Sequence, residues 1–243
     1  MKKNFIQRHM IWASLILVCF LFIPAIKDSY CMESDDKTAG VQSIDKKEPS
    51  VEKIRVVLDP GHGGYDDGSV SEDGIKEKDL TLIISKKVGS ILEKNNIEVI
   101  YTRTSDEVTW SDDNVEDLLE RSRIANESNA ACFVSIHLNS SDVYQDEIRG
   151  HEIWVNYEDD RNVELAKAIQ SKMQKLSNSE DRGIKDQATS PLSILVYNKI
   201  PTVLVETGFL SNAQDTAYVQ SEKGSDEIAE AIAAGIMKFI TEK

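Results

Sequence analysis

Three side chains that can bind a metal ion or move a proton follow short apolar runs of the sequence. His62 lies in Asp-Pro-Gly-His-Gly-Gly, directly after Ile-Arg-Val-Val-Leu, and His137 closes an apolar run that begins at residue 131. Glu206 follows Pro-Thr-Val-Leu-Val. Because ligands collect outside the carboxyl ends of parallel strands, we expect these three side chains to converge on one edge of a sheet.

A fourth residue, Glu77, precedes a helical pattern and could reach the same cluster. Two neutral imidazoles and one carboxylate are the ligand set of a catalytic zinc ion with one position open for water. Taken singly, each residue also has an ordinary explanation. A histidine after a strand is commonly a loop residue, Glu77 suits a helix N-terminus, and Glu206 could cap a turn. The coincidence of the positions favours a metal site.

Other candidates are weaker. His9 belongs to the N-terminal segment, and His151 begins an alternating pattern that is typical of an ordinary strand. Asp66 and Asp67 are loop acids close to the first predicted ligand, and either could orient its imidazole. Cys132 has apolar neighbours, so we expect a buried structural thiol.

Hydrophobic periodicity predicts the elements that must position these residues. Short β-branched or alternating runs predict strands at 54–58, 97–101, 131–137, 150–156 and 201–205. Apolar residues three or four apart predict helices at 78–95, 114–129, 163–176 and 225–240. Strands that alternate with helices of this length predict an α/β domain with a mostly parallel central sheet and helices on both faces.

Composition excludes several classes of protein. The chain has 243 residues, 40% of them hydrophobic, and a formal net charge of −14. The first 27 residues contribute +4 to this total, so residues 28–243 carry −18. The apolar content excludes full disorder, and a surface this acidic repels phosphate backbones. We therefore expect no nucleic-acid partner.

The N-terminal segment predicts export. Residues 1–27 combine basic side chains with an uncharged apolar run, and this pattern predicts either a cleaved signal peptide or a retained membrane anchor. Residues 28–52 are polar and acidic and predict a linker. The folded domain is therefore expected at 53–243, outside the cytoplasmic membrane.

Four motifs in this order, VVLDPGHGG, GIKEKDL, SIHLNSS and VETGFLSN, resemble the zinc-dependent N-acetylmuramoyl-L-alanine amidases of bacterial cell walls, the amidase-3 family. The likeness extends from about Arg55 to the C-terminal helix and includes Thr102-Arg103 and the segment LLERSRIAN. A chain of this size with an N-terminal membrane segment most resembles the spore-cortex members, which help to make muramic lactam.

The resemblance implies a role for each matched residue. The metal ligands of the family, for one Zn²⁺ per chain, fall on His62, Glu77 and His137, and the catalytic carboxylate falls on Glu206. Asn139 matches an asparagine that the family keeps near its second histidine, so it could contact substrate or support a ligand.

The implied reaction is hydrolysis of the amide between the muramic-acid lactyl group and L-Ala in peptidoglycan. An activating or positioning protein partner is left open, because the matched domain is followed by no repeat that resembles a wall-binding module. Two alternatives come from other classes: a zinc peptidase or carboxypeptidase acting on free peptides, and a non-catalytic wall-binding domain.

Overall fold

The computed structural model describes residues 53–143, 147–189 and 192–242. The predicted export segment at 1–27 and the predicted linker at 28–52 lie outside the described residues. Among the helices that the structure describes, none has the length and apolar content needed to span a membrane.

Six strands form one sheet in the order β2-β1-β3-β6-β4-β5. Parallel pairing joins β2 to β1, β1 to β3, β3 to β6 and β4 to β5, whereas β4 pairs antiparallel with β6. The predicted mostly parallel sheet is therefore confirmed. The strands are β1 (Arg55–Pro60), β2 (Glu98–Tyr101), β3 (Phe133–Asn139), β4 (His151–Val155), β5 (Asp181–Asp186) and β6 (Thr202–Phe209).

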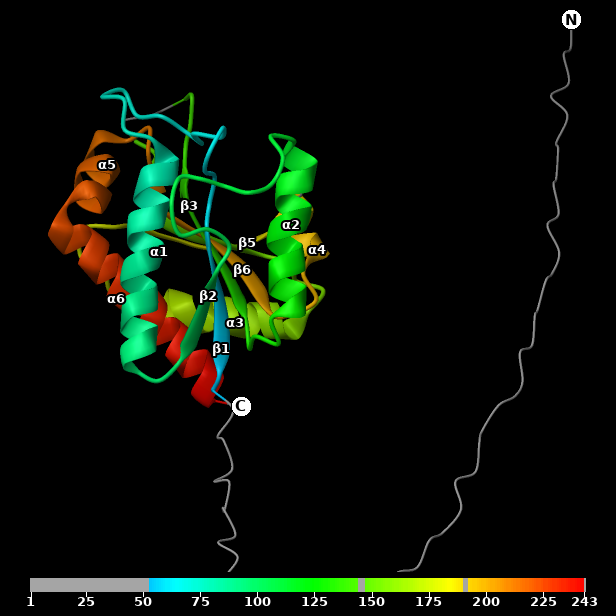
Figure 1. Cartoon of the computed structure of the whole chain (residues 1–243). Coiled ribbons are helices and arrows are strands. Elements are labelled where there is room, and N and C mark those ends of the chain that lie inside the picture. The colour runs from blue at the N-terminus through cyan, green and yellow to red at the C-terminus, as the bar shows by residue number, and fades with distance from the viewer. Residues whose placement is uncertain (1–52, 144–146, 190–191, 243) are drawn as a thin grey trace, which may run out of the picture. The chain divides into compact units, whose positions relative to one another are not determined.

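Helices cover both faces of this sheet, as predicted (Figure 1). One face packs against α1, α3 and α6, and the other packs against α2 and the short α4. The helices are α1 (Glu77–Lys94), α2 (Asn114–Glu127), α3 (Asp160–Met173), α4 (Ser193–Tyr197), α5 (Ala213–Gln220) and α6 (Glu222–Thr241).

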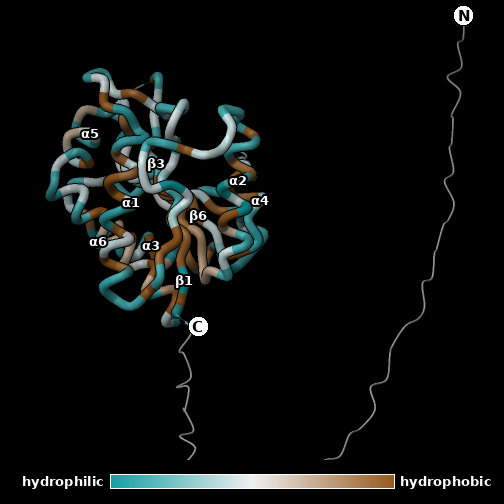
Figure 2. Tube along the Cα trace, viewed as in Figure 1, coloured by the Kyte–Doolittle hydropathy of each residue, from teal (hydrophilic) through white to brown (hydrophobic). Residues whose placement is uncertain are grey.

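The central strands are apolar on both faces because helices bury both. Val56, Val57 and Leu58 of β1 have no exposed surface, as expected for a parallel strand between two helical layers. Figure 2 shows this pattern as brown strands inside a largely teal periphery. Cys132, just before β3, is fully buried, as predicted.

Four of the described elements were not predicted: β5, the 3₁₀ helix η1 (Gln187–Thr189), α4 and α5. The β5 sequence Asp-Arg-Gly-Ile-Lys-Asp is too polar to read as a strand, because β5 is an edge strand of the sheet. The helices α4 and α5 span only 5 and 8 residues, too few to repeat a helical pattern. The strands β3 and β6 also run further than predicted, so that His137 and Glu206 lie within strands and not at their ends.

A buried ion pair lies beneath the loop that follows β1. Asp59 is 1% exposed and accepts hydrogen bonds from Thr102 Oγ1 at 2.6 Å, Ser135 Oγ at 2.7 Å and Arg121 Nη1 at 2.7 Å. Burial opposes ionisation of this carboxyl, but the Arg121 charge and these donors hold its pKa below the ordinary value. The carboxylate is therefore ionised and fully partnered inside the domain.

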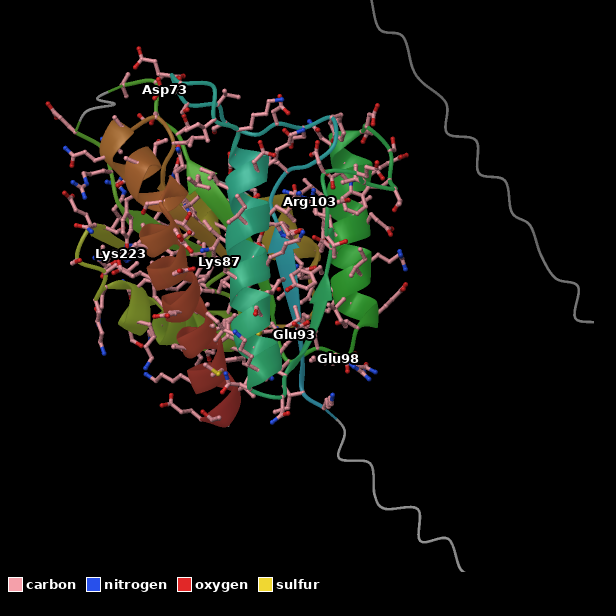
Figure 3. The ribbon with its side chains drawn as sticks, turned by 60° about the vertical axis from the view of Figure 1, so that its left-hand side comes forward. Asp73, Lys87, Glu93, Glu98, Arg103 and Lys223 are labelled. Carbon is pink, nitrogen blue, oxygen red and sulfur yellow. The ribbon has the colours of Figure 1, made fainter. Side chains whose placement is uncertain are left out.

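Arg121 and Arg103 also hold the backbone of the loop. Arg121 donates to the Pro60 carbonyl at 2.9 Å and to the His62 carbonyl at 2.8 Å. Arg103 donates to the carbonyls of Pro60 at 3.0 Å and Gly61 at 2.9 Å. Figure 3 shows Arg103 between α1 and α2. Two buried guanidinium groups thus fix three consecutive carbonyls, those of residues 60–62.

Removing the Arg121 side chain should destabilise the domain strongly. Arg121→Ala leaves the buried carboxylates of Asp59 and Asp117 without their cation, which costs about 3–5 kcal/mol in the free energy of unfolding. Urea denaturation measures this loss. Arg123→Ala is the matched control two residues away, because the ion pairs of Arg123 with Glu120 and Glu127 are exposed and contribute little. Equal effects of the two substitutions would contradict the buried-pair interpretation.

Candidate metal centre

The structure brings His62, Glu77 and His137 together at the carboxyl-end edge of β1 and β3. Glu77 Oε1 lies 3.0 Å from His62 Nε2 and 3.0 Å from His137 Nδ1. One ligand atom from each residue lies within 4.8 Å of the other two. The two imidazole rings meet edge to face, with their centroids 4.8 Å apart. These three side chains come from a loop, a helix and a strand that are distant in sequence.

His62 is held in an unusual backbone conformation. Its φ of 61° lies in the left-handed region, which non-glycine residues seldom occupy. Its carbonyl is fixed by Arg121, and its ring nitrogen Nδ1 donates to Asp66 Oδ2 at 2.7 Å. This hydrogen bond leaves Nε2 directed at Glu77. A carboxylate that orients a histidine in this way sets which nitrogen can bind a metal ion.

Two glycines leave room for the cluster. A Cβ atom on Gly61 would stand 2.4 Å from Cε1 of His137, and one on Gly68 would stand 2.6 Å from Cδ2 of His62. Gly68 also has a φ of +67°. Either position would therefore displace a candidate ligand if it carried a side chain.

Glu77 is the first residue of α1 and is almost fully buried. Its Oε2 accepts from the Ser69 backbone amide at 2.9 Å, and its Oε1 accepts from the Leu138 amide at 2.9 Å. The N-terminus of a helix also favours a negative charge. The ordinary and the functional explanations of Glu77 are therefore compatible, since the helix end places the carboxylate between the two imidazoles.

Mutual attraction shifts the pKa values of the cluster. Burial disfavours the charged form of His62, but hydrogen bonds to Asp66 and Glu77 outweigh it and raise the pKa of His62 to about 10. Burial likewise disfavours ionised Glu77, yet contacts with His137 and His62 hold the pKa of Glu77 well below its ordinary value. The His62 imidazole and the Glu77 carboxylate therefore attract each other strongly, which keeps the cluster compact.

Glu206 lies beside the cluster on the same face of the sheet. It pairs in register with His137 of the parallel neighbour β3. Its Oε2 is shielded from solvent and has no hydrogen-bond partner among the described residues. Burial, followed by the negative charges of Glu77 and Glu152, raises the pKa of Glu206 well above its ordinary value. A carboxylate of this kind is poised to take up a proton.

Asn139 does not contact the three candidate ligands through its side-chain nitrogen. Instead its Nδ2 donates to Glu152 Oε1 at 2.8 Å, and Trp154 Nε1 donates to the same oxygen at 3.0 Å. Glu152, 3% exposed, lies opposite Glu206 in the antiparallel register of β4 and β6. Sequence reasoning missed Glu152. The signal was present, since this acid occupies a strand position that alternates with buried apolar residues.

The structure places the weaker candidates Asp67 and His151 outside the three-residue cluster. Asp67 pairs with Lys76 and Lys78 and takes no part in orienting His62, unlike Asp66. His151 is fully buried at the start of β4, where its Nδ1 contacts Ser179 Oγ at 2.8 Å, so it is the strand residue that its pattern predicted.

The residues present fit a divalent metal ion. Two imidazole nitrogens and one carboxylate oxygen converge, and an unpartnered carboxylate stands beside them. This donor set, on the edge of a mostly parallel α/β sheet, is the arrangement of a metal-dependent hydrolase.

Comparison with known proteins identifies the family within this class. Residues 56–238 match the family model described as N-acetylmuramoyl-L-alanine amidase. The germination-specific N-acetylmuramoyl-L-alanine amidase of Bacillus subtilis is 33% identical over 195 residues, which cover 77% of this chain and 80% of that protein. The chain therefore belongs to the N-acetylmuramoyl-L-alanine amidase family, and the amidase resemblance is confirmed.

Solved structures agree with this assignment. An N-acetylmuramoyl-L-alanine amidase from Clostridium difficile 630 is similar with a TM-score of 0.71 and 34% identity, and the match covers 79% of this chain and 98% of that one. The CwlD amidase from Clostridioides difficile, solved in complex with the GerS lipoprotein, has a TM-score of 0.69 and 33% identity, with coverage of 79% and 100%.

Asp66 and Asp67 provide a direct test of the centre. Asp66→Asn removes the charged acceptor that orients His62 and should weaken affinity for a divalent metal ion by about 10- to 100-fold. Asp67→Asn is the matched control, because Asp67 faces two lysines instead. Competition with a chromogenic chelator measures both affinities. A centre that binds metal equally well in both variants would contradict the orienting role of Asp66.

Proposed function

We propose that this protein is a zinc-dependent enzyme that cleaves the amide between the lactyl group of N-acetylmuramic acid and L-Ala of the stem peptide. His62, Glu77 and His137 would hold the ion, and Glu206 would act as general base and then general acid. Family membership supports the bond that is cleaved, and the convergence of the three donors supports the metal.

The observation that carries this proposal is the state of Glu206. Its Oε2 is buried without a hydrogen-bond partner in the described part of the chain, and its pKa is raised by burial and by neighbouring acids. An unpartnered buried oxygen is costly for the fold. Because this one stands beside three metal donors, it is available to a reacting molecule.

The roles of the residues follow from these positions. Zinc, when bound, supplies a Lewis acid that polarises a carbonyl oxygen and acidifies water. Glu206 then takes a proton from the attacking water as the new C–O bond forms. It delivers that proton to the L-Ala nitrogen as the C–N bond breaks, so that one carboxyl serves both steps. Asn139 and Trp154 fix Glu152 next to Glu206, which maintains the raised pKa of the proton carrier.

Glu206→Gln should separate proton transfer from metal binding. The amide cannot accept the proton, so kcat should fall by about 10²- to 10⁴-fold, while zinc content stays at one ion per chain. Muropeptide hydrolysis and elemental analysis measure the two quantities. Glu180→Gln, at a position whose side chain is 66% exposed, is the control. Equal loss of zinc and activity in Glu206→Gln would make Glu206 a ligand and refute its assigned role.

The relatives also support a proposal for the setting of the reaction. The germination-specific enzyme and the CwlD amidase support action on the cell wall, with the spore cortex and formation of muramic lactam as the finer proposal. Residues 1–27 would export or anchor a catalytic domain at 53–243, with 28–52 as linker. A protein partner is also proposed, because CwlD was solved with a lipoprotein.

Product analysis tests the function as a whole. Digestion of purified peptidoglycan should release complete stem peptides that begin with L-Ala, and glycan strands with free lactyl groups. A chelator should abolish this release and added zinc should restore it. Cleavage within the peptides only would favour a zinc peptidase, binding without release would favour a wall-binding domain, and activity indifferent to chelator would refute the metal centre.

A further inference from the structure

Arg182, on the edge strand β5, lies close to Glu206, and most of its hydrogen-bond donors are not used by the fold. Arg182 is the second residue of β5, and its side chain is 33% exposed. Its Nε donates to Glu152 Oε2 at 3.0 Å, and its guanidinium carbon lies 4.9 Å from the centroid of the Phe209 ring. The ion pair and the aromatic ring hold the guanidinium plane in place.

Most of the hydrogen-bonding capacity of this group remains unused. Within the described part of the chain, Nε makes the one hydrogen bond of the Arg182 side chain, and Nη1 and Nη2 donate to no protein acceptor. A guanidinium fork with free terminal nitrogens matches the two oxygens of a carboxylate. Because the fork is already oriented, little conformational entropy is lost when an anion binds.

The topology places this fork next to the reacting atoms. Glu152 joins the two sites, since it is bonded to Arg182 and pairs in register with Glu206. Directly opposed residues of an antiparallel pair have Cβ atoms about 4.5–5.5 Å apart. Both β4 and β5 run opposite to β6, so their first residues lie at the edge where Glu206 and His137 stand. Arg182 is therefore one side chain removed from the proton carrier.

Charge makes this position distinctive. Residues 53–243 carry a formal charge of −14, and the negative charges of Glu77 and Glu152 act on Glu206. Such a field repels an anionic substrate unless a cation receives it. Lys185 pairs in register with Trp154 and so shares the face of the sheet that carries Glu206. Arg182 and Lys185 thus form a small basic strip on edge strand β5.

We infer that Arg182 binds a carboxylate of the stem peptide and makes the enzyme selective for stems that carry that charge close to the scissile amide. A stem whose second residue is γ-linked glutamate presents a free α-carboxylate there, and amidation of that group removes the charge. The inference rests on the proposed function, because it assigns a substrate group to the same site.

Paired substrates test this subsite. The zinc-loaded protein is given two muropeptides that differ only in the α-carboxylate or α-carboxamide of the second stem residue. The natural enzyme should favour the carboxylate in kcat/KM by about 10- to 100-fold, the range expected for a charge-assisted hydrogen bond. Arg182→Gln should bring this ratio close to 1 by slowing only the carboxylate substrate. Arg182→Lys, which keeps the charge beside Glu152 but lacks the fork, should give an intermediate ratio.

The test includes a control variant, and its contrary results distinguish failure of this inference from failure of the proposed function. Arg161→Gln removes another arginine stacked on an aromatic ring, that of Phe239 on the opposite face, and should leave the ratio unchanged. A natural enzyme without preference would overturn the inference and leave the amidase assignment intact. Equal loss on both substrates in Arg182→Gln would also overturn it, because Arg182 would then act only through Glu152. Failure of the natural enzyme to cleave either muropeptide, or peptidoglycan, would refute the proposed function itself.

Discussion

The burial of one ion pair under the loop after β1 is the constraint on which the site depends. Asp59 and Arg121 are almost without solvent contact. Their attraction offsets the cost of removing both charges from water only because every remaining N–H group of Arg121 finds an acceptor. The acceptors are the Asp117 carboxylate and the carbonyls of the loop itself. The same guanidinium that neutralises the core therefore fixes the backbone of His62, and stability and site geometry cannot be varied independently.

A second constraint comes from the sheet. Parallel pairing places His137 beside Glu206, and antiparallel pairing places Glu152 opposite Glu206 from the other side. The carboxyl groups of Glu77, Glu152 and Glu206 thus lie within one small region. Two imidazoles and a guanidinium balance Glu77 and Glu152, which leaves Glu206 as the group that is not compensated. The uneven distribution of partners, and not the chemistry of any one acid, separates the proposed proton carrier from the proposed metal ligands.

Much of the fold and of the candidate site could be predicted from the sequence, because the signals were local. Apolar runs predicted the buried strands, and the positions of His62 and His137 after or within them placed both at one edge. The edge strand β5 and the short α4 were inaccessible, since their stability comes from tertiary contacts and not from an apolar pattern of their own. Glu152 was missed for a related reason: its alternation with apolar residues is visible locally, but its position opposite Glu206 depends on pairing with β6, which no local pattern reports.

The reversed direction of β4 has a consequence for how such a domain can diversify. Because β3 and β4 run in opposite directions on either side of β6, β3 ends and β4 begins on the same edge of the sheet, beside the half of β6 that carries Glu206. Lengthening a surface connection is cheap, about 0.6 kcal/mol for each doubling. Extra residues added after β3 or before β4 would therefore lie at the edge of the sheet next to the candidate centre, where neither helical layer has to change.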